Sequence, residues 1–198
     1  MPQKSKQQAL DRVAEEIRQC LVCQKGKTGL AVPGEGNPDA NIVFLGEAPG
    51  KEEAKTGRPF IGRSGKLLRE MIGKLGIRPE DVFITSPVKY LPTYITPTPD
   101  DIAHGKIHLE EQLSIIQPAV IVLLGRVAAL AALGSIGPVL KKHGTVISKD
   151  GRNYFLTIHP AAPLYAPKMK VVIEEDFKIL RLFLKQQFSL KNTGMKTK

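Results

Sequence analysis

The stretch IVFLGEAPG, residues 42–50, is followed closely by GRPFIG, residues 57–62. A run of apolar residues is typical of a buried strand, and the glycines and prolines behind it predict a loop whose backbone comes close to a ligand. The loop also carries two acids, Glu47 and Glu53, and one aromatic residue, Phe60. A pocket for a flat polar ring needs these groups, although the loop alone indicates the class of ligand only weakly.

The order of strand, glycine-containing loop and helix recurs along the chain. Apolar runs at 41–46, 82–85 and 119–124 are each followed by a loop and then by a helical pattern of apolar or alanine residues. This spacing predicts parallel strands joined by crossover helices. We therefore expect an α/β protein, built as a three-layer α/β/α sandwich around a central, mainly parallel sheet of about four to five strands.

The remaining patterns predict a hairpin and two terminal helices. Residues 144–149 and 153–158 flank Asp150-Gly151, a pair that is typical of a tight turn between antiparallel strands. Apolar residues at helical spacing predict one helix over 7–20 and a last helix over about 168–188. In such a sheet, a ligand binds beyond the carboxyl ends of the parallel strands.

Two further signals mark the starts of helices, and none marks a second domain. Ser64 and Thr98 are residue types that cap helices at their amino ends. We find no internal repeat and expect one domain over residues 1–198, with residues 189–198 as a flexible basic tail. The loops 46–64, 86–99 and 159–167 are expected to meet at one edge of the sheet.

The charge of the chain indicates a polyanionic partner. The 198 residues contain 29 Lys and Arg against 19 Asp and Glu, a formal net charge of +10. Basic residues gather near the glycine loops, at Arg58, Arg63, Lys66 and Arg69, which favours a nucleic acid over a merely solvated basic surface. Two cysteines exclude a secreted disulfide scaffold, and no leader or long apolar stretch is present, so we expect a soluble, cytoplasmic protein.

Three further patterns bear on which ligand, catalytic group or metal the protein could use. The glycine loop lacks the ending of a P-loop and the spacing of a dinucleotide fingerprint, which argues against nucleoside triphosphates and NAD. His159 follows a strand and could serve a site or satisfy a loop carbonyl. Cys20 and Cys23 have metal-ligand spacing but form half a site. His104 or His108 could complete it only if the fold brings them close, and two packed thiols is the interpretation we favour.

Several motifs occur together in the order of one known family. They are GEAPG at 46–50, GRPFIG at 57–62, GKLL at 65–68, TPDDI at 98–102 and HPAA at 159–162. With this set, the sequence resembles the uracil-DNA glycosylase superfamily, and most of all its family 4. The resemblance covers about residues 7–188. It implies a DNA repair hydrolase of base excision repair, which flips uracil out of DNA and hydrolyses its N-glycosidic bond, leaving an abasic site.

The sequence departs from the family pattern at two places. Family 4 enzymes usually hold a [4Fe-4S] cluster on four cysteines, of which Cys20 and Cys23 match the first pair. Tyr90 and Gly105 stand at the later two positions, so we expect no cofactor and name the two cysteines only as weak metal candidates. Ser86 stands where the family commonly has an asparagine that reads the edge of uracil.

The resemblance also implies roles in the pocket. Phe60 would stack on the flipped base, and Gly46, Ala48 and Ser86 would line the base site. Glu53 would narrow the space at the C5 edge, where thymine carries its methyl group. His159 would donate a hydrogen bond to O2 as negative charge grows there.

The group that orders the attacking water is less clear from the resemblance. Family 1 enzymes use an aspartate at the position of Ala48, and this chain lacks it. Glu47 is the first choice for ordering the water or bracing the loop, and Glu53 is the second. No lysine is clearly placed as a nucleophile, so we expect base excision without strand cleavage.

The expected partner is uracil-containing DNA, single or double stranded, bound by a monomer. Arg63, Ser64 and Lys66 would contact phosphates at the start of a helix. Ala161 and Leu164 lie in the segment expected to enter the minor groove, with Leu164 as the wedge or, alternatively, as a core residue. Two other functions stay open: a DNA-binding protein with an inactive pocket, and a glycosylase for other deaminated bases.

Overall fold

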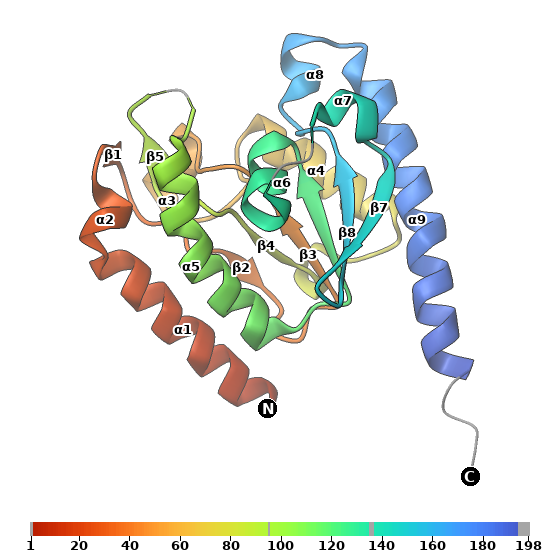
Figure 1. Cartoon of the computed structure of the whole chain (residues 1–198), viewed down its shortest axis with the longest axis horizontal. Coiled ribbons are helices and arrows are strands. Elements are labelled where there is room, and N and C mark those ends of the chain that lie inside the picture. The colour runs from red at the N-terminus through yellow and green to blue at the C-terminus, as the bar shows by residue number, and fades with distance from the viewer. Residues whose placement is uncertain (1, 95, 135–136, 194–198) are drawn as a thin grey trace.

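A twisted sheet lies between two layers of helices (Figure 1). The computed structural model describes residues 2–94, 96–134 and 137–193, with side chains up to residue 188. Its strands are β1 (Lys27–Thr28), β2 (Glu35–Gly36), β3 (Ile42–Leu45), β4 (Phe83–Thr85), β5 (Leu91–Pro92), β6 (Val120–Leu124), β7 (Thr145–Lys149) and β8 (Arg152–Thr157). Its helices are α1 (Gln3–Gln19), α2 (Leu21–Gln24), α3 (Lys51–Thr56), α4 (Arg63–Lys74), η1 (Pro79–Asp81), α5 (Pro99–Ile116), α6 (Arg126–Leu133), α7 (Val139–Lys142), α8 (Ala162–Tyr165) and α9 (Met169–Thr193).

The central sheet confirms the predicted fold class and has one strand more than expected. Its order is β2-β4-β3-β6-β8-β7, in which β4, β3, β6 and β8 are parallel and the edge strands β2 and β7 are antiparallel. The extra strand, β2, contains two residues and carries no apolar pattern that a sequence could reveal. A separate ladder joins β1 to β5.

Alternate side chains of the central strands enter two different cores. Val43 and Leu45 pack with residues of α1, α5 and α6 on one face of the sheet. Ile42 and Phe44 pack with residues of α4 and α9 on the other face, where Phe44 stacks on Phe177 with ring centroids 6.2 Å apart. A strand that is covered on both faces is therefore apolar at every residue, as the sequence 42–45 is.

One predicted cap and one predicted turn are confirmed, whereas a second cap and the end of the last helix are corrected. Thr98 caps α5 through a reciprocal capping box with Asp101, and Asp150-Gly151 turns the β7–β8 hairpin with positive φ angles of 50° and 74°. Ser64 does not cap α4, because the helix already begins at Arg63 with Gly62 as its N-cap. α9 continues to Thr193, so residues 189–193 are helical rather than part of a tail; residues 194–198 lie outside the described residues.

The amino-terminal segment forms a side wall of the molecule. α1 lies alongside α5, and α2 and β1 continue past the amino end of α5 (Figure 1). β1 then pairs with β5, so the segment before β3 and the loop after β4 are joined. Among the helices of residues 2–94, 96–134 and 137–193, none has the length and apolar character that crossing a membrane requires.

Candidate active site

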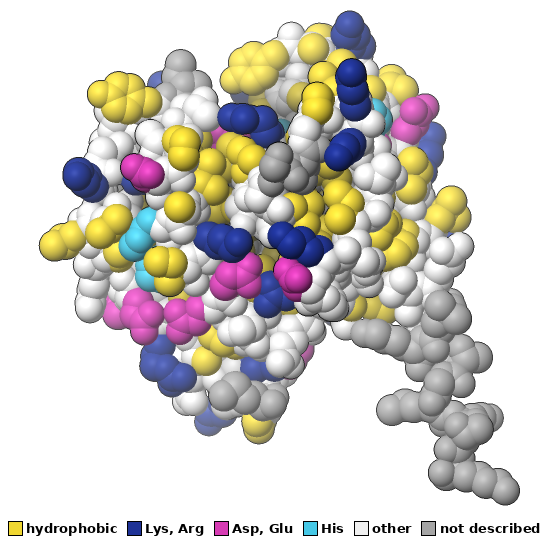
Figure 2. All heavy atoms as spheres, viewed as in Figure 1, with side chains coloured by type: hydrophobic (Ala, Val, Ile, Leu, Met, Phe, Trp, Pro, Cys, Tyr) yellow, Lys and Arg dark blue, Asp and Glu magenta, His cyan; other side chains and the backbone are white. Residues whose placement is uncertain are grey.

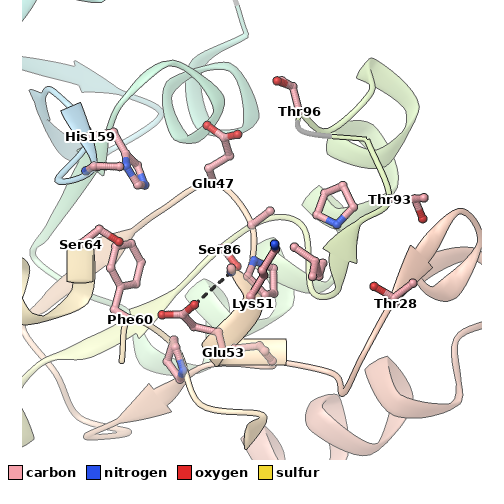
Figure 3. Close-up of a pocket in the computed structure, with 18 of the residues that line it drawn as sticks. Thr28, Glu47, Lys51, Glu53, Phe60, Ser64, Ser86, Thr93, Thr96 and His159 are labelled. Carbon is pink, nitrogen blue, oxygen red and sulfur yellow. Dashed lines mark hydrogen bonds between the residues drawn. The ribbon is translucent and has the colours of Figure 1, made fainter. Parts of the chain in front are cut away.

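A cavity of about 700 Å³ opens at the carboxyl ends of the parallel strands. The three loops that the sequence predicted to meet there all contribute to it, through Glu47, Phe60, Ser86 and His159 among others. Figure 3 shows these side chains around one space, with His159 and Phe60 on one side and Glu47 opposite. The structure therefore brings together an acid and an aromatic ring from one loop and an imidazole that lies 112 residues after Glu47 and 99 residues after Phe60 in sequence.

Phe60 forms one wall of the cavity and is held in an unusual backbone conformation. Its φ is +52°, a left-handed value that is strained for a bulky residue and that clusters at functional sites. A Cβ atom at Gly46 would lie 2.6 Å from the Phe60 ring, and one at Gly65 would lie 1.9 Å from the Phe60 carbonyl oxygen. A side chain at either position would push against Phe60, so the two glycines allow the residue to keep this conformation.

His159 lies beside Phe60 on the same side of the cavity, with ring centroids 6.0 Å apart and the two rings tilted by 33°. The Ala161 N–H donates to His159 Nδ1 over 3.1 Å, so in the neutral ring the proton is on Nε2. Burial lowers the pKa of His159 to about 4, which keeps the ring neutral at physiological pH. Gly125, with a φ of +90°, allows this close approach, because a Cβ there would lie 3.0 Å from the His159 Cβ. The residue can thus present one neutral N–H donor to a ligand.

Glu47 supplies the carboxyl group of the cavity. It follows β3 directly after Gly46 and is partly buried, and burial raises the pKa of its carboxyl above the ordinary value while Arg126 acts against this. In Figure 3 its carboxyl group points into the space between His159 and Thr96. A desolvated carboxylate beside an open cavity is a reasonable base for a water molecule.

Glu53 holds the glycine loop through three backbone N–H groups. Its Oε1 accepts the N–H groups of Ile61 (2.9 Å) and Gly62 (2.8 Å), and its Oε2 accepts the N–H of Gly50 (3.1 Å). The carboxylate is buried and joins both ends of the glycine loop. Glu53 therefore braces the loop. Its side chain also lines the cavity, so its role at the C5 edge and its second-choice role in ordering water stay predictions.

We expect Glu53→Gln to lower the free energy of unfolding by about 1–3 kcal/mol, because an amide cannot accept all three N–H groups and leaves buried donors unpaired. Urea denaturation measures this. The matched control is Glu52→Gln, whose exposed carboxylate contacts only Lys55 and should change the free energy by less than about 1 kcal/mol. Equal effects of the two substitutions would contradict the bracing role of Glu53.

Ser86 lines the cavity with its hydroxyl already committed as a donor. Its Oγ–H donates to the Val88 carbonyl over 2.8 Å, so toward a ligand the oxygen can act only as an acceptor. The segment behind it is fixed by the buried amine of Lys89, which donates to Thr85 Oγ1 (2.7 Å), Gln112 Oε1 (2.8 Å) and the Pro33 carbonyl (3.0 Å). The edge of a bound base would therefore meet a rigid acceptor.

The rim of the cavity carries the residues predicted to contact DNA. Ser64 and Ala161 line the cavity, while Arg63 and Lys66 on α4 are exposed beside it. Leu164 on α8 is 42 % exposed, so it is not the core residue that the alternative interpretation required. Figure 2 shows Lys and Arg side chains over the middle and upper part of this hollowed face.

Two arginines of the predicted basic cluster form ion pairs within the protein instead of pointing freely toward an anionic partner. Arg58 and Arg69 both form ion pairs with Glu35, over 2.9 Å and 2.8 Å. Arg69 also donates to the carbonyl groups of Pro59 (3.2 Å) and Phe60 (3.3 Å). They hold the loop that carries Phe60, so only part of the cluster is available for an anionic partner.

Comparison with known proteins agrees with this geometry. The sequence model of the Uracil DNA glycosylase superfamily matches residues 33–181, which include the whole cavity-forming set of loops. The chain belongs to this superfamily. It is 37% identical over 190 residues to the type-4 uracil-DNA glycosylase of Thermotoga maritima, covering 92% of this chain and 98% of that protein.

Two archaeal relatives extend the similarity. The type-4 uracil-DNA glycosylase of Archaeoglobus fulgidus is 40% identical over 181 residues, covering 86% of this chain and 91% of the relative. That of Sulfurisphaera tokodaii is 39% identical over 188 residues, covering 87% and 84%. The resemblance to family 4 that the motifs indicated is thereby confirmed.

A second group of reactive side chains lies between α2 and α5. Cys20, Cys23, His104 and His108 each offer a ligand atom, and these atoms all lie within 4.8 Å of one another. The structure thus meets the condition that the sequence left open, since the fold does bring both histidines to the cysteine pair. The group could hold a metal ion, which is at odds with the expectation that no cofactor binds.

Sequence reasoning missed several residues that line the cavity, among them Lys51 and Tyr165, and one glycine, Gly125, that packs against His159. Tyr165 is 87 % exposed at the mouth of the cavity. Gly125 holds the backbone open for His159. Each had a signal: Lys51 follows the glycine loop, Tyr165 lies in the segment after the His-Pro motif, and Gly125 directly follows a predicted parallel strand.

Proposed function

We propose that this chain is a monofunctional, monomeric, single-domain uracil-DNA glycosylase, which hydrolyses the bond between uracil and deoxyribose and leaves an abasic site. The observation that carries the proposal is that Phe60 and a neutral His159 donor lie side by side in one cavity. The curated relatives named type-4 uracil-DNA glycosylases support it, because they match nearly the whole chain.

The base would lie flat against the Phe60 ring, with Ala48 near its edge. Gly46 lies against the Phe60 ring, so it would support this platform. The N3–H of uracil is a donor, and Ser86 Oγ is left as an acceptor, so the two are complementary. Adenine and thymine differ in ways this slot can read: N1 of adenine carries no hydrogen, and thymine adds a methyl group at C5. A missing methyl contact alone gives only about 1–3 kcal/mol of discrimination, so firm exclusion of thymine needs the wall that Glu53 and its loop provide.

The chemistry needs stabilisation of two developing charges. When the bond between C1′ and N1 breaks, its electron pair stays on uracil, and negative charge spreads to O2. The Nε2–H of His159 would donate to that oxygen. The deoxyribose becomes cationic and is attacked at C1′ by water, whose proton passes to the carboxylate of Glu47.

DNA would be held by the rim of the cavity. Arg63, Ser64 and Lys66 at the start of α4 offer two cations and a helix amino end to the phosphates. Leu164 would enter the minor groove from α8, with Tyr165 beside it on the same exposed turn. Such a wedge would offset the loss of stacking when the nucleotide is extruded.

The test is the release of uracil from a labelled oligonucleotide at stoichiometric enzyme, first single stranded and then opposite guanine and adenine. We expect strand breaks only after alkali, and no covalent complex after borohydride, which would trap a Schiff base on Lys51. Strands that stay intact after alkali would favour a DNA-binding protein with an inactive pocket. A trapped complex that is lost in Lys51→Ala would contradict the monofunctional assignment.

One observation favours a wider range of bases. The Ser86 oxygen accepts a hydrogen bond from any ring N–H beside a carbonyl, and hypoxanthine and xanthine offer this pattern as uracil does. The same assay with these lesions therefore measures the breadth of the activity. If uracil alone is released, the size of the cavity, and not the hydrogen bond to Ser86, excludes hypoxanthine and xanthine.

A further inference from the structure

The group at Cys20, Cys23, His104 and His108 has the geometry of a single-ion site. A tetrahedral ion with bonds of about 2.0–2.3 Å holds its ligand atoms about 3.3–3.8 Å apart. The four ligand atoms here all lie within 4.8 Å of one another, and Cys20 Sγ is 3.1 Å from His104 Nε2. Small movements of side chains would therefore place an ion at their centre.

The local backbone arranges these side chains as ligands. Cys20 is the N-cap of α2, and the Cys23 N–H donates to the Cys20 sulfur over 3.4 Å, so both thiols are turned to the same side. His104 and His108 are four residues apart on α5 and share one face of that helix. In Figure 2, the His side chains on the left of the face lie over the region where Figure 1 places α2 and α5.

His108 supplies an independent sign of an absent partner. It is only 9 % exposed, and within the described part of the chain neither of its ring nitrogens has a hydrogen-bond partner. A buried polar atom without a partner costs free energy, and native structures seldom leave one unexplained. A ring nitrogen of His108 also lies within 4.8 Å of carboxylate oxygens of Glu16 and Glu111, groups of the kind that orient a ligating histidine from behind.

The family's four-cysteine [4Fe-4S] cluster does not fit these residues. Tyr90 stands at one of the later cysteine positions, and its ring is buried while its hydroxyl lies 3.3 Å from the Arg18 carbonyl. Gly105 stands at the other, where a Cβ atom would lie 2.1 Å from the Pro87 carbonyl oxygen. A cysteine at position 105 would therefore require the backbone to move.

We propose that this chain binds one Zn²⁺ ion through Cys20, Cys23, His104 and His108, at the place where its relatives' family holds an iron–sulfur cluster. Two thiolates and two imidazoles in tetrahedral arrangement are a set that zinc prefers. A [2Fe-2S] cluster can also use two cysteines and two histidines, but it assigns the pairs to separate irons. The contact between Cys20 and His104 is too close for ligands on opposite sides of such a cluster.

The ion has a route to the site and a structural consequence. A cavity of about 400 Å³ adjoins the group and is lined by Cys23, His104 and Gly105. The ion would join the end of α1 and α2 to α5, across 84 residues of sequence. β1 follows α2 and pairs with β5, and Leu91 and Pro92 of β5 line the base cavity. An ion that fixes α2 would therefore also stabilise one wall of the active site.

The first experiment measures zinc, iron and acid-labile sulfide in the purified full-length protein, produced with both metals available. We expect about one zinc per chain and no stoichiometric iron. Cys20→Ser and His104→Gln should each lose zinc, while Glu111→Gln, which alters only the neighbouring carboxylate group, should keep it. Stoichiometric iron, with or without sulfide, would overturn the proposal. So would zinc that is lost in Glu111→Gln but retained in Cys20→Ser.

A second experiment uses the unsubstituted protein alone, so it does not depend on the folding of any variant. After chelation, Co²⁺ is added in place of zinc, and its visible spectrum is recorded. We expect the intense absorption of a tetrahedral ion with a thiolate-to-cobalt band, together with a Tm that falls by about 10 °C on chelation and returns with zinc. A spectrum of octahedral cobalt without that band, or a Tm that chelation does not change, would overturn the proposal.

Discussion

His159→Ala is expected to lower the single-turnover rate of uracil release by about 10²–10³-fold, which is the usual loss when one donor to a developing oxyanion is removed. The reason is the fixed proton position: the Ala161 N–H occupies Nδ1, so Nε2–H is left as the donor that we propose meets O2 of the departing base. Because burial lowers the pKa of His159 to about 4, the ring is neutral throughout the physiological range. A quenched-flow assay with enzyme in excess over DNA isolates this step from product release.

The matched variant is His159→Asn, which keeps an N–H donor on a shorter side chain and should recover part of the rate. His143→Ala provides the control for loss of an imidazole, because His143 contacts Asp176 and does not line the cavity. Binding of DNA that holds an uncleavable uracil analogue should stay within a few-fold in all three variants. Equal rates for His159→Ala and the unsubstituted protein would remove His159 from the chemistry.

Glu47→Gln is expected to reduce the same rate by about 10²-fold and to change its dependence on pH. Burial raises the pKa of the Glu47 carboxyl, so the carboxylate form is lost at a higher pH than for an exposed glutamate. If the carboxylate accepts the proton of water, the rate of the unsubstituted protein rises with pH through that pKa and is level above it. The rate of Glu47→Gln should lack this rise.

The pH profile also separates Glu47 from His159. Protonation of His159 occurs near pH 4, whereas the limb assigned to Glu47 lies above the ordinary value for a glutamate. Glu53→Gln serves as a comparison, because it removes a carboxylate that holds backbone amides and should lower stability without removing the limb. A limb that persists in Glu47→Gln would place the base on another group.

Much of the fold follows from local patterns. The apolar runs at β3, β4 and β6 predicted parallel strands, and Asp150-Gly151 predicted the β7–β8 turn. Residues 153–158 were predicted only as one strand of that hairpin, and the pairing of β8 with β6 was not foreseen. Such signals are readable because they lie within a few residues of the structure they specify. β2 could not be predicted, because a strand of two residues is too short to show an alternating pattern of apolar and polar side chains. The end of α9 was also placed too early, because polar residues near 189 do not stop a helix.

Several residues of the site could be predicted from the sequence, but the hydrogen bonds that they form could not. Glu47, Phe60 and His159 line the same cavity, as expected for loops at the carboxyl ends of parallel strands. The bonds of Glu53 join residues three, eight and nine positions away across a loop, and no periodicity reports such contacts. His104 and His108 were named as ligands only on the condition that the fold brings them close to the cysteine pair, because their spacing alone does not reveal that α2 contacts α5.

The left-handed backbone at Phe60 determines which molecule must change shape. Gly46 and Gly65 pack directly against Phe60, where any other residue would place a Cβ atom. We therefore expect the aromatic platform to keep this position when a target binds. The whole cost of distortion then falls on the nucleic acid. A rigid slot of this kind should respond to how easily a nucleotide leaves its helix, which makes weakly paired or unpaired uracils the ones that are excised first.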